Sequence, residues 1–142
     1  MIAEWKKYPA SLDFYEEMRD ELAAVFDAAQ LPEDVRMKTE IGFEEAVVNI
    51  INYAYEDDGD IRIKISFDDE FFNIELVDHG QPFNPLEHND ARAEDDSPID
   101  MREPGGFGIF LLKKTFDKLN YSRENFNGKP ANHLTLSLRR ID

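Results

Sequence analysis

The chain of 142 residues is long enough for one domain with a buried core, and 31 acidic against 16 basic residues give it a formal net charge of -15. This excess of acids disfavours a nucleic-acid duplex or an anionic membrane as the main partner, because both reward Lys and Arg. The absence of cysteine excludes disulfides and thiolate metal sites. No apolar run approaches the roughly 20 residues that cross a bilayer, and no signal peptide is visible. We therefore expect a single cytoplasmic domain over residues 1–142.

The first part of the chain predicts a short strand and two long helices. Residues 2–9 are typical of a strand, and Ser11 is a suitable N-cap for a helix over about 11–29. Pro32 and the acids after it favour a second helix, which we expect to run to about Tyr55. Apolar residues recur at helical spacing within the first helix: Leu12, Tyr15, Met18, Leu22, Val25, Phe26 and Ala29.

Two strands and a long polar segment follow. The runs "IRIKISF" (61–67) and "FNIELVD" (72–78) alternate apolar and polar residues, and the acidic link between them predicts a hairpin. The polar segment 84–104 has little periodicity and many acids. An irregular segment of this length is uncommon in a small domain and is typical of a lid or binding loop.

The last part of the chain predicts a third helix and a second hairpin. In the hairpin, "NYS" begins one strand, "NFNGKP" forms the turn and "HLTLSLRR" forms the last strand. This order of elements favours an α/β (α+β) two-layer sandwich, with a mixed, mainly antiparallel sheet and helices packed on one face. The third helix is predicted from apolar residues at helical spacing: Phe107, Phe110, Leu111, Phe116 and Leu119.

A carboxylate and a carboxamide share one face of the second helix. Glu45 and Asn49 are four residues apart, and the sequence around Asn49 is apolar. Such a pair can share a divalent cation or a water, and the neutral Asn oxygen suits Mg²⁺, which keeps most of its own waters. The plainer alternative, an Asn and a Glu at the edge of the core with satisfied hydrogen bonds, stays open.

Another carboxylate ends the second strand on its apolar face. Asp78 shares that face with Phe72, Ile74 and Leu76, where burial is costly unless the carboxylate is paired. Gly80 follows and permits a tight backbone. Asp78 is expected either to bond its own backbone in a turn or to accept a hydrogen bond from an N–H of a bound ring.

Three glycines stand at the start of the third predicted helix, in "PGGFGIFLL". They are Gly105, Gly106 and Gly108. A helix N-terminus exposes free N–H groups that attract anions, and glycines let a phosphate come close, although a flexible cap or hinge explains them equally well. Neither a P-loop nor a dinucleotide fingerprint is present. Together, the three polar placements predict an adenine-nucleotide site with segment 84–104 as its lid.

These motifs resemble those of the GHKL ATPases and kinases, which include gyrase, the heat-shock chaperone, histidine kinases and MutL. The N box resembles "EAVVN", the first glycine box "DHGQPF" and the second "GGFGIFLL". The chain is more closely similar to the stand-alone anti-sigma factor serine/threonine kinases of the RsbW/SpoIIAB type. The shared features are the short chain, the "E-A-V-x-N" run ending in "A-Y", and "GG-x-G-I-x-L-L". The resemblance covers nearly the whole chain.

The resemblance implies a Bergerat ATP-binding fold, usually dimeric, that uses ATP and Mg²⁺. Asn49 would hold Mg²⁺, and Glu45 would be the general base for a Ser or Thr hydroxyl of a protein substrate. That substrate would be an anti-sigma antagonist of the STAS type, and the kinase would also bind a sigma factor. A homodimer is expected, with the first strand and helix as a possible interface.

The resemblance also implies how the nucleotide is held. Asp78 would accept from the adenine amino group, and Gly80 would pass close to the purine. The glycines Gly105, Gly106 and Gly108 would hinge the lid and let helix N–H groups reach the phosphates. Apart from the resemblance, phosphoryl transfer requires neutralisation of phosphate charge, to which Arg92 or Arg102 in the lid would add.

The chain departs from the family pattern in two places. Tyr53 stands where many relatives have His, and "ANH" (131–133) stands where relatives often have Gly-Thr beside the adenine. These departures motivate an alternative, a non-catalytic ATP-binding regulatory module that gates a protein partner through its lid. A gyrase-like ATPase or a histidine-kinase fragment is disfavoured, because we expect neither a second domain nor a phospho-accepting His. The histidines lack metal-ligand spacing and are expected at the surface or in loops: His79, His88 and His133.

Overall fold

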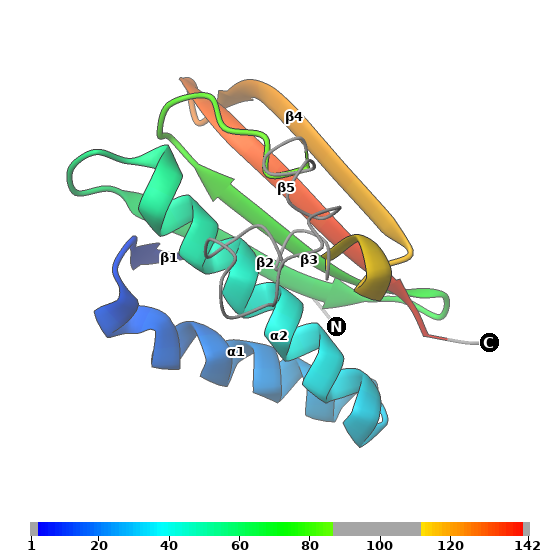
Figure 1. Ribbon diagram of the computed structural model, residues 1–142. Coiled ribbons are helices and arrows are strands. Elements are labelled where there is room, and N and C mark those ends of the chain that lie inside the picture. The colour runs from blue at the N-terminus through cyan, green and yellow to red at the C-terminus, as the bar shows by residue number, and fades with distance from the viewer. Residues whose placement is uncertain (1–2, 87–111, 141–142) are drawn as a thin grey trace, which may run out of the picture.

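The computed structural model describes residues 3–86 and 112–140, which form a sheet with two long helices against one face (Figure 1). In this part of the chain the sheet has five strands in the order β1-β2-β3-β5-β4, and every neighbouring pair is antiparallel. The predicted two-layer sandwich with a mainly antiparallel sheet is confirmed, and no parallel pair occurs among the described strands. The elements in chain order are β1 (Lys6–Pro9), the 3₁₀ turn η1 (Leu12–Phe14), α1 (Tyr15–Ala29), α2 (Glu33–Asn49), the π-helical segment η2 (Ile50–Ala54), β2 (Asp60–Phe67), β3 (Phe71–Asp78), β4 (Lys118–Phe126) and β5 (Lys129–Arg139).

Strands β2 and β3 form the centre of the core. Their alternating apolar side chains point to the helices, and the register pairs Ile63 with Leu76 and Ile61 with Asp78. A slip by one residue would turn every one of these side chains to the opposite face, so the buried row fixes the register. Full burial of one such aliphatic side chain stabilises the fold by roughly 1.5–3 kcal/mol.

Both predicted hairpins are confirmed, and each turn has a local cause. In the β2–β3 turn, Oδ1 of Asp68 accepts hydrogen bonds from the backbone N–H groups of Glu70 (2.8 Å) and Phe71 (2.7 Å). In the β4–β5 turn, Asn127 and Gly128 have φ angles of 55° and 82°. Two consecutive positive φ angles match the twist of a tight hairpin, and Asn-Gly is the sequence that favours them.

The first helix begins as expected, although with a tighter first turn. The side chain of Ser11 accepts a hydrogen bond from the backbone N–H of Asp13 (3.2 Å) and caps η1, after which α1 runs from Tyr15. The helix ends at Gln30, whose φ of 57° is left-handed. Its core-facing stripe is the one that the spacing predicted: Met18, Leu22, Val25, Phe26 and Ala29.

The second helix has the predicted extent but not a uniform geometry. Residues Glu33–Asn49 are α-helical, and residues Ile50–Ala54 continue as a π-helical segment. Wider turns of this kind are rare and are frequently found at functional sites. Here the widened end brings the carbonyl of Ala54 against the backbone of Gln81, whose N–H donates to it at 2.8 Å.

The prediction for the third helix is wrong at its C-terminal end. The described helical residues are 112–115, and Leu119 lies in β4 instead of in a helix. The backbone N–H of Asp117 donates to the carbonyl of Ser137 (2.9 Å), and Leu119 pairs with Leu136. Pairing with β5 therefore overrides the helical spacing of this segment.

The first strand is shorter than predicted. It covers Lys6–Pro9 instead of 2–9 and pairs with β2 at the edge of the sheet. Among the described helices, none combines the length and the apolarity that a bilayer crossing demands.

Candidate functional site

The candidate site lies where the C-terminal end of α2, the segment η2 and the end of β3 meet on one side of the molecule (Figure 1). Three of the polar residues buried there are Asn49, Asp78 and Asn132, whose exposed fractions are 1%, 2% and 3%. Because a buried polar group is costly without a partner, each contact of these side chains carries information about the role of the site.

Glu45 and Asn49 share a helix face, as predicted, and contact each other. Nδ2 of Asn49 donates to Oε1 of Glu45 at 3.3 Å. This orientation leaves the amide oxygen of Asn49 as the atom that could coordinate a cation. Within the described residues, no group of three or more His, Asp or Glu side chains could hold a metal ion. Asn49 therefore fits Mg²⁺ as a single protein ligand, and the cation would take its other ligands from water and phosphate oxygens.

The half-buried carboxyl of Glu45 has a raised pKa, which favours its role as a proton acceptor. Burial raises its pKa, and the neighbouring Glu44 adds to the rise, while the hydrogen bond from Asn49 opposes it. A carboxylate with a raised pKa holds a captured proton better at neutral pH, which is what a general base requires.

Asp78 is held through only one of its two oxygens. Its Oδ1 accepts from the backbone N–H of Gly80 (3.0 Å) and from Nδ2 of Asn132 (2.8 Å). The bond from Gly80 forms the turn that was one of the two alternatives expected for Asp78. Burial raises the pKa of the Asp78 carboxyl, whereas the bonds from Asn132 and Gly80 and the charge of Arg123 oppose the rise. Among the described residues, no donor reaches Oδ2.

Gly80 is required by packing against η2. A Cβ at this position would lie 2.2 Å from the carbonyl oxygen of Ala54, a backbone atom that cannot turn away. The sequence led us to expect a close approach to a purine, and the structure adds this second reason for a glycine. The contact fixes where the chain leaves β3.

Asn132 is the residue of the site that the sequence analysis missed. It lies directly opposite Asp78 in the β3–β5 register. Its Nδ2 donates to Asp78 and to the carbonyl of Gln81 at 2.8 Å each. Its Oδ1 accepts from the hydroxyl of Tyr121 (2.5 Å) and from the backbone N–H of Phe83 (3.2 Å). Only the strand register shows that "ANH" supplies the partner of Asp78.

Tyr53 helps to position the segment that leads into the predicted lid. Its ring stacks on Phe83 with a centroid distance of 5.4 Å, and its carbonyl accepts from Nε2 of Gln81 at 2.7 Å. Tyr53, which departs from the family pattern, therefore packs on Phe83, and the backbone N–H of Phe83 donates to Asn132.

Other predicted elements of the site lie outside the described residues. These are Gly105, Gly106, Gly108, Arg92, Arg102 and His88, and the lid apart from residues 84–86. The remaining histidines, His79 and His133, are partly exposed, as the expectation of a surface position requires. His133 belongs to β5, and its Nε2 lies 3.0 Å from Oε1 of Glu75, because β5 pairs with β3 along its length.

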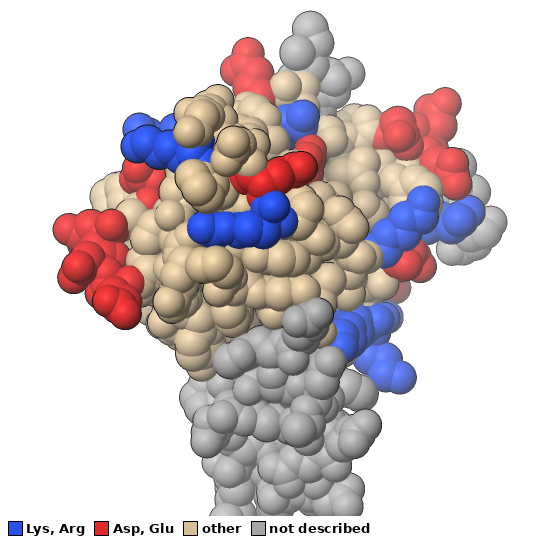
Figure 2. All heavy atoms as spheres, turned by 90° about the horizontal axis from the view of Figure 1, so that it is seen from above, with Lys and Arg blue, Asp and Glu red and all other residues tan. Residues whose placement is uncertain are grey.

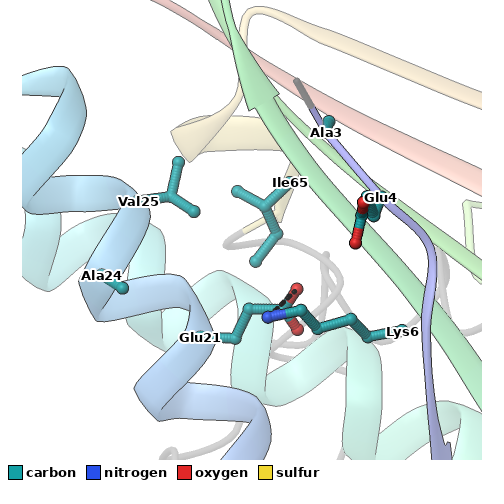
Figure 3. A pocket seen from close by; sticks show the side chains of 7 residues that line it. All are labelled: Ala3, Glu4, Lys6, Glu21, Ala24, Val25 and Ile65. Atoms are coloured by element: carbon teal, nitrogen blue, oxygen red, sulfur yellow. Dashed lines mark ion pairs between the residues drawn. The ribbon is translucent and has the colours of Figure 1, made fainter. Parts of the chain in front are cut away.

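A separate cavity of about 240 Å³ lies between α1 and the segment that leads into β1 (Figure 3). Glu21 and Lys6 form an ion pair across it at 3.8 Å, and the hydroxyl of Tyr8 donates to Glu21 at 2.8 Å. None of the motif residues lines this cavity. The contacts of Glu21 with Lys6 and Tyr8 hold β1 to α1.

The surface charge agrees with the composition. On the face shown in Figure 2, described Lys and Arg side chains lie interspersed with Asp and Glu and form no continuous basic surface. A nucleic-acid backbone rewards a basic stripe, which this face does not offer.

A two-layer sandwich with these residues at its helix and strand ends defines a class of ATPase domain. Residues 8–138 match the family described as the histidine kinase-like ATPase domain. The chain belongs to this family, within the GHKL superfamily, and its sandwich is the Bergerat fold.

Relatives with curated names are serine-protein kinases called RsbW. The protein from Staphylococcus epidermidis is 27% identical over 124 residues, which cover 84% of this chain and 78% of the relative. The protein from Staphylococcus aureus (strain JH9) has the same identity and coverage. The protein from Oceanobacillus iheyensis is 23% identical over 122 residues, with 83% and 77% covered. These matches confirm the resemblance that the motifs indicated.

Proposed function

We propose that this protein is an ATP-dependent serine/threonine protein kinase that phosphorylates an anti-sigma antagonist of the STAS type and regulates a sigma factor by binding it. The observation that carries the proposal is the Glu45–Asn49 pair on α2. The family of the chain and the names of its RsbW relatives support the choice of reaction.

The proposed nucleotide site combines this pair with Asp78 and Gly80. Oδ2 of Asp78 accepts from the amino group of adenine, and Gly80 lets the backbone pass close to the ring. We assign segment 84–104 as the lid, with Gly105, Gly106 and Gly108 as its hinge and phosphate-side wall. Asn49 holds Mg²⁺ through its amide oxygen.

The proposed reaction is a direct phosphoryl transfer. The Ser or Thr oxygen of the protein substrate forms a bond to the γ-phosphorus as the bond from that phosphorus to the β,γ-bridging oxygen breaks, and ADP leaves. Glu45 accepts the hydroxyl proton. Mg²⁺, when bound, neutralises phosphate charge, which a chain with a net charge of -15 cannot do with its own side chains alone.

The test separates the base from its exposed neighbour. Transfer of labelled γ-phosphate to a purified antagonist is measured for Glu45→Gln and, as matched control, Glu44→Gln. Because a general base contributes about 10²–10⁴-fold, we expect Glu45→Gln to lose at least about 100-fold in rate with ATP affinity retained. Glu44→Gln is expected to stay within about twofold, since its side chain is exposed. An unchanged rate in Glu45→Gln would contradict the assigned base.

One observation favours a second candidate, a regulatory module that binds ATP without turnover. The stack of Tyr53 on Phe83 and the bond from Phe83 to Asn132 tie the start of the lid to the site. Such a link could transmit nucleotide binding to a protein partner. Tight ATP binding with no transfer to any antagonist would favour this candidate over the kinase.

We also propose that the protein acts in the cytoplasm as a homodimer. Strand β1 supports this assignment, because it lies at the edge of the sheet, where backbone groups on its outer side are available to a second chain. Sedimentation of the purified protein tests it, and a monomer at micromolar concentration would contradict it.

A further inference from the structure

Side chains spaced by four residues form one row along the surface of α2: Met37, Ile41, Glu45 and Asn49. Residues four apart are neighbours on a helix, and such rows run at a slight angle to the helix axis. Met37 and Ile41 are 64% and 48% exposed. Glu45 is half-buried, and Asn49 is only 1% exposed. The row therefore leads from open surface into the candidate site.

The two exposed members of the row are large apolar side chains within a charged surrounding. The neighbouring exposed side chains on α2 are Asp34, Lys38 and Glu44. A single exposed apolar side chain is ordinary at a protein surface. Two adjacent ones inside a charged rim match the anatomy of a protein–protein interface, which is apolar at its centre and polar at its edge.

The chemistry of the proposed reaction fixes the side from which the protein substrate approaches. In phosphoryl transfer the attacking and leaving oxygens lie roughly in line, on opposite sides of the phosphorus. ADP leaves toward the Asn49 end of the row, so the acceptor hydroxyl reaches Glu45 from the exposed end. Along the helix axis, Ile41 lies about 6 Å and Met37 about 12 Å from Glu45 in that direction.

The size of a protein interface extends the substrate over both apolar side chains. A specific interface covers about 800 Å² on each partner, which corresponds to a disc of roughly 16 Å radius. A disc of this size around Glu45 includes Ile41 and Met37. The surface that presents a hydroxyl to Glu45 therefore covers these two side chains as well.

We propose that Met37 and Ile41 form a docking surface for the protein substrate and contact apolar side chains next to its acceptor Ser or Thr. The inference rests on the proposed function, because it assumes that Glu45 receives the hydroxyl proton. A docking contact is made equally before and in the transition state. It therefore lowers the KM for the protein substrate and leaves kcat unchanged.

Steady-state transfer of γ-phosphate from ATP to a purified STAS-type antagonist tests the inference. Met37→Gln/Ile41→Gln introduces neutral side chains with good helix propensity, so no charge is added beside Glu45. We expect the KM for the antagonist to rise at least about 10-fold, while kcat and the KM for ATP stay within about twofold. The matched control is Ala28→Gln, at an exposed position near the C-terminal end of α1, which is expected to leave both KM values unchanged.

An apolar replacement separates docking from a general effect of altered side chains. Met37→Leu/Ile41→Met keeps two large apolar side chains, and we expect its KM for the antagonist to stay within about threefold of the wild type. Urea unfolding is expected to give the same midpoint for all variants, because the substituted positions are exposed. Equal rises in KM for the apolar and the Gln replacements would overturn the proposed apolar recognition.

The outcomes separate the two levels of inference. If the wild type transfers phosphate and Met37→Gln/Ile41→Gln keeps its KM for the antagonist, the docking surface is wrong and the proposed function stands. If that variant keeps the KM but binds a sigma factor less tightly, or dissociates as a homodimer in sedimentation, the surface serves that other partner and the proposal is overturned. No transfer by the wild type would contradict the proposed function, and the docking surface with it.

Discussion

Strand β3 carries two carboxylates, three residues apart, in opposite situations. Glu75, on the face turned away from α1 and α2, contacts His133 at 3.0 Å and Lys64 at 3.6 Å. The hydrogen bond with His133 lowers the pKa of Glu75, and Lys64 adds to the effect. Asp78 faces the helices and contacts only neutral donors, and burial raises its pKa.

The difference shows how one strand separates structure from binding. The hydrogen bond with His133 and the charge of Lys64 stabilise the charged form of Glu75, so this carboxylate strengthens the sheet. Asp78 gains too little from its partners to offset burial, so its charge is a cost to the fold. A carboxylate kept in such a position, with one oxygen unengaged by the described residues, is a strong candidate for a ligand contact.

The largest expected effect concerns nucleotide binding. Asp78→Ala removes the proposed acceptor, and we expect ATP affinity to fall at least about 100-fold. Glu75→Ala, on the same strand, is expected to change ATP affinity by less than about twofold. Titration calorimetry with Mg²⁺ measures both, and comparable losses in the two variants would remove the distinction between the carboxylates.

The next effect concerns the backbone beside Asp78. Gly80→Ala forces a Cβ toward the carbonyl oxygen of Ala54, and we expect a loss of roughly 1–3 kcal/mol in the free energy of unfolding. Gly128→Asn is the control, because no atom lies within 4 Å of a Cβ there and Asn tolerates the positive φ. Urea unfolding measures both, and a neutral Gly80→Ala would show that the contact with η2 is not tight.

A smaller effect is the pH dependence of the free energy of unfolding, which is expected to differ between Asp78 and Glu75. The raised folded-state pKa of Asp78 gives a stabilising contribution that is complete below its unfolded pKa and is lost as the pH rises through the folded pKa. Asp78→Asn mimics the protonated form. It is therefore expected to match the wild type in acid and to exceed its stability by roughly 1–2 kcal/mol at neutral pH.

Glu75 is expected to show the reverse dependence. Its lowered folded-state pKa gives a contribution that is present above the unfolded pKa and is lost as the pH falls through the folded pKa. Glu75→Gln is therefore expected to destabilise the fold by about 1 kcal/mol at neutral pH and by less in acid. Urea unfolding across the acid range measures both variants. Parallel pH profiles would contradict the contrast between the two faces.

Much of the fold was readable from the sequence because local periodicity coincides with burial. The alternation from Ile61 to Phe67 predicts one apolar face of β2. The stripe from Met18 to Ala29 predicts one apolar face of α1. Both faces are buried in the structure. The turns at Asp68 and Asn127 followed from side-chain chemistry and positive φ. The segment around Leu119 was misread, because its spacing suits a helix while its backbone pairs with β5.

The sequence by itself determined the chemical groups of the candidate site. Glu45 and Asn49 are neighbours on any helix, and the burial of Asp78 follows from its place in an alternating strand. Only the tertiary structure decided that Asn132 pairs with Asp78 and that Gly80 packs on Ala54. Both contacts join residues that are far apart in the sequence, and strand register and the widened end of α2 bring them together. Local patterns cannot show that Oδ1 of Asp78 has a second donor, because that donor, Asn132, lies 54 residues from Asp78 in the sequence.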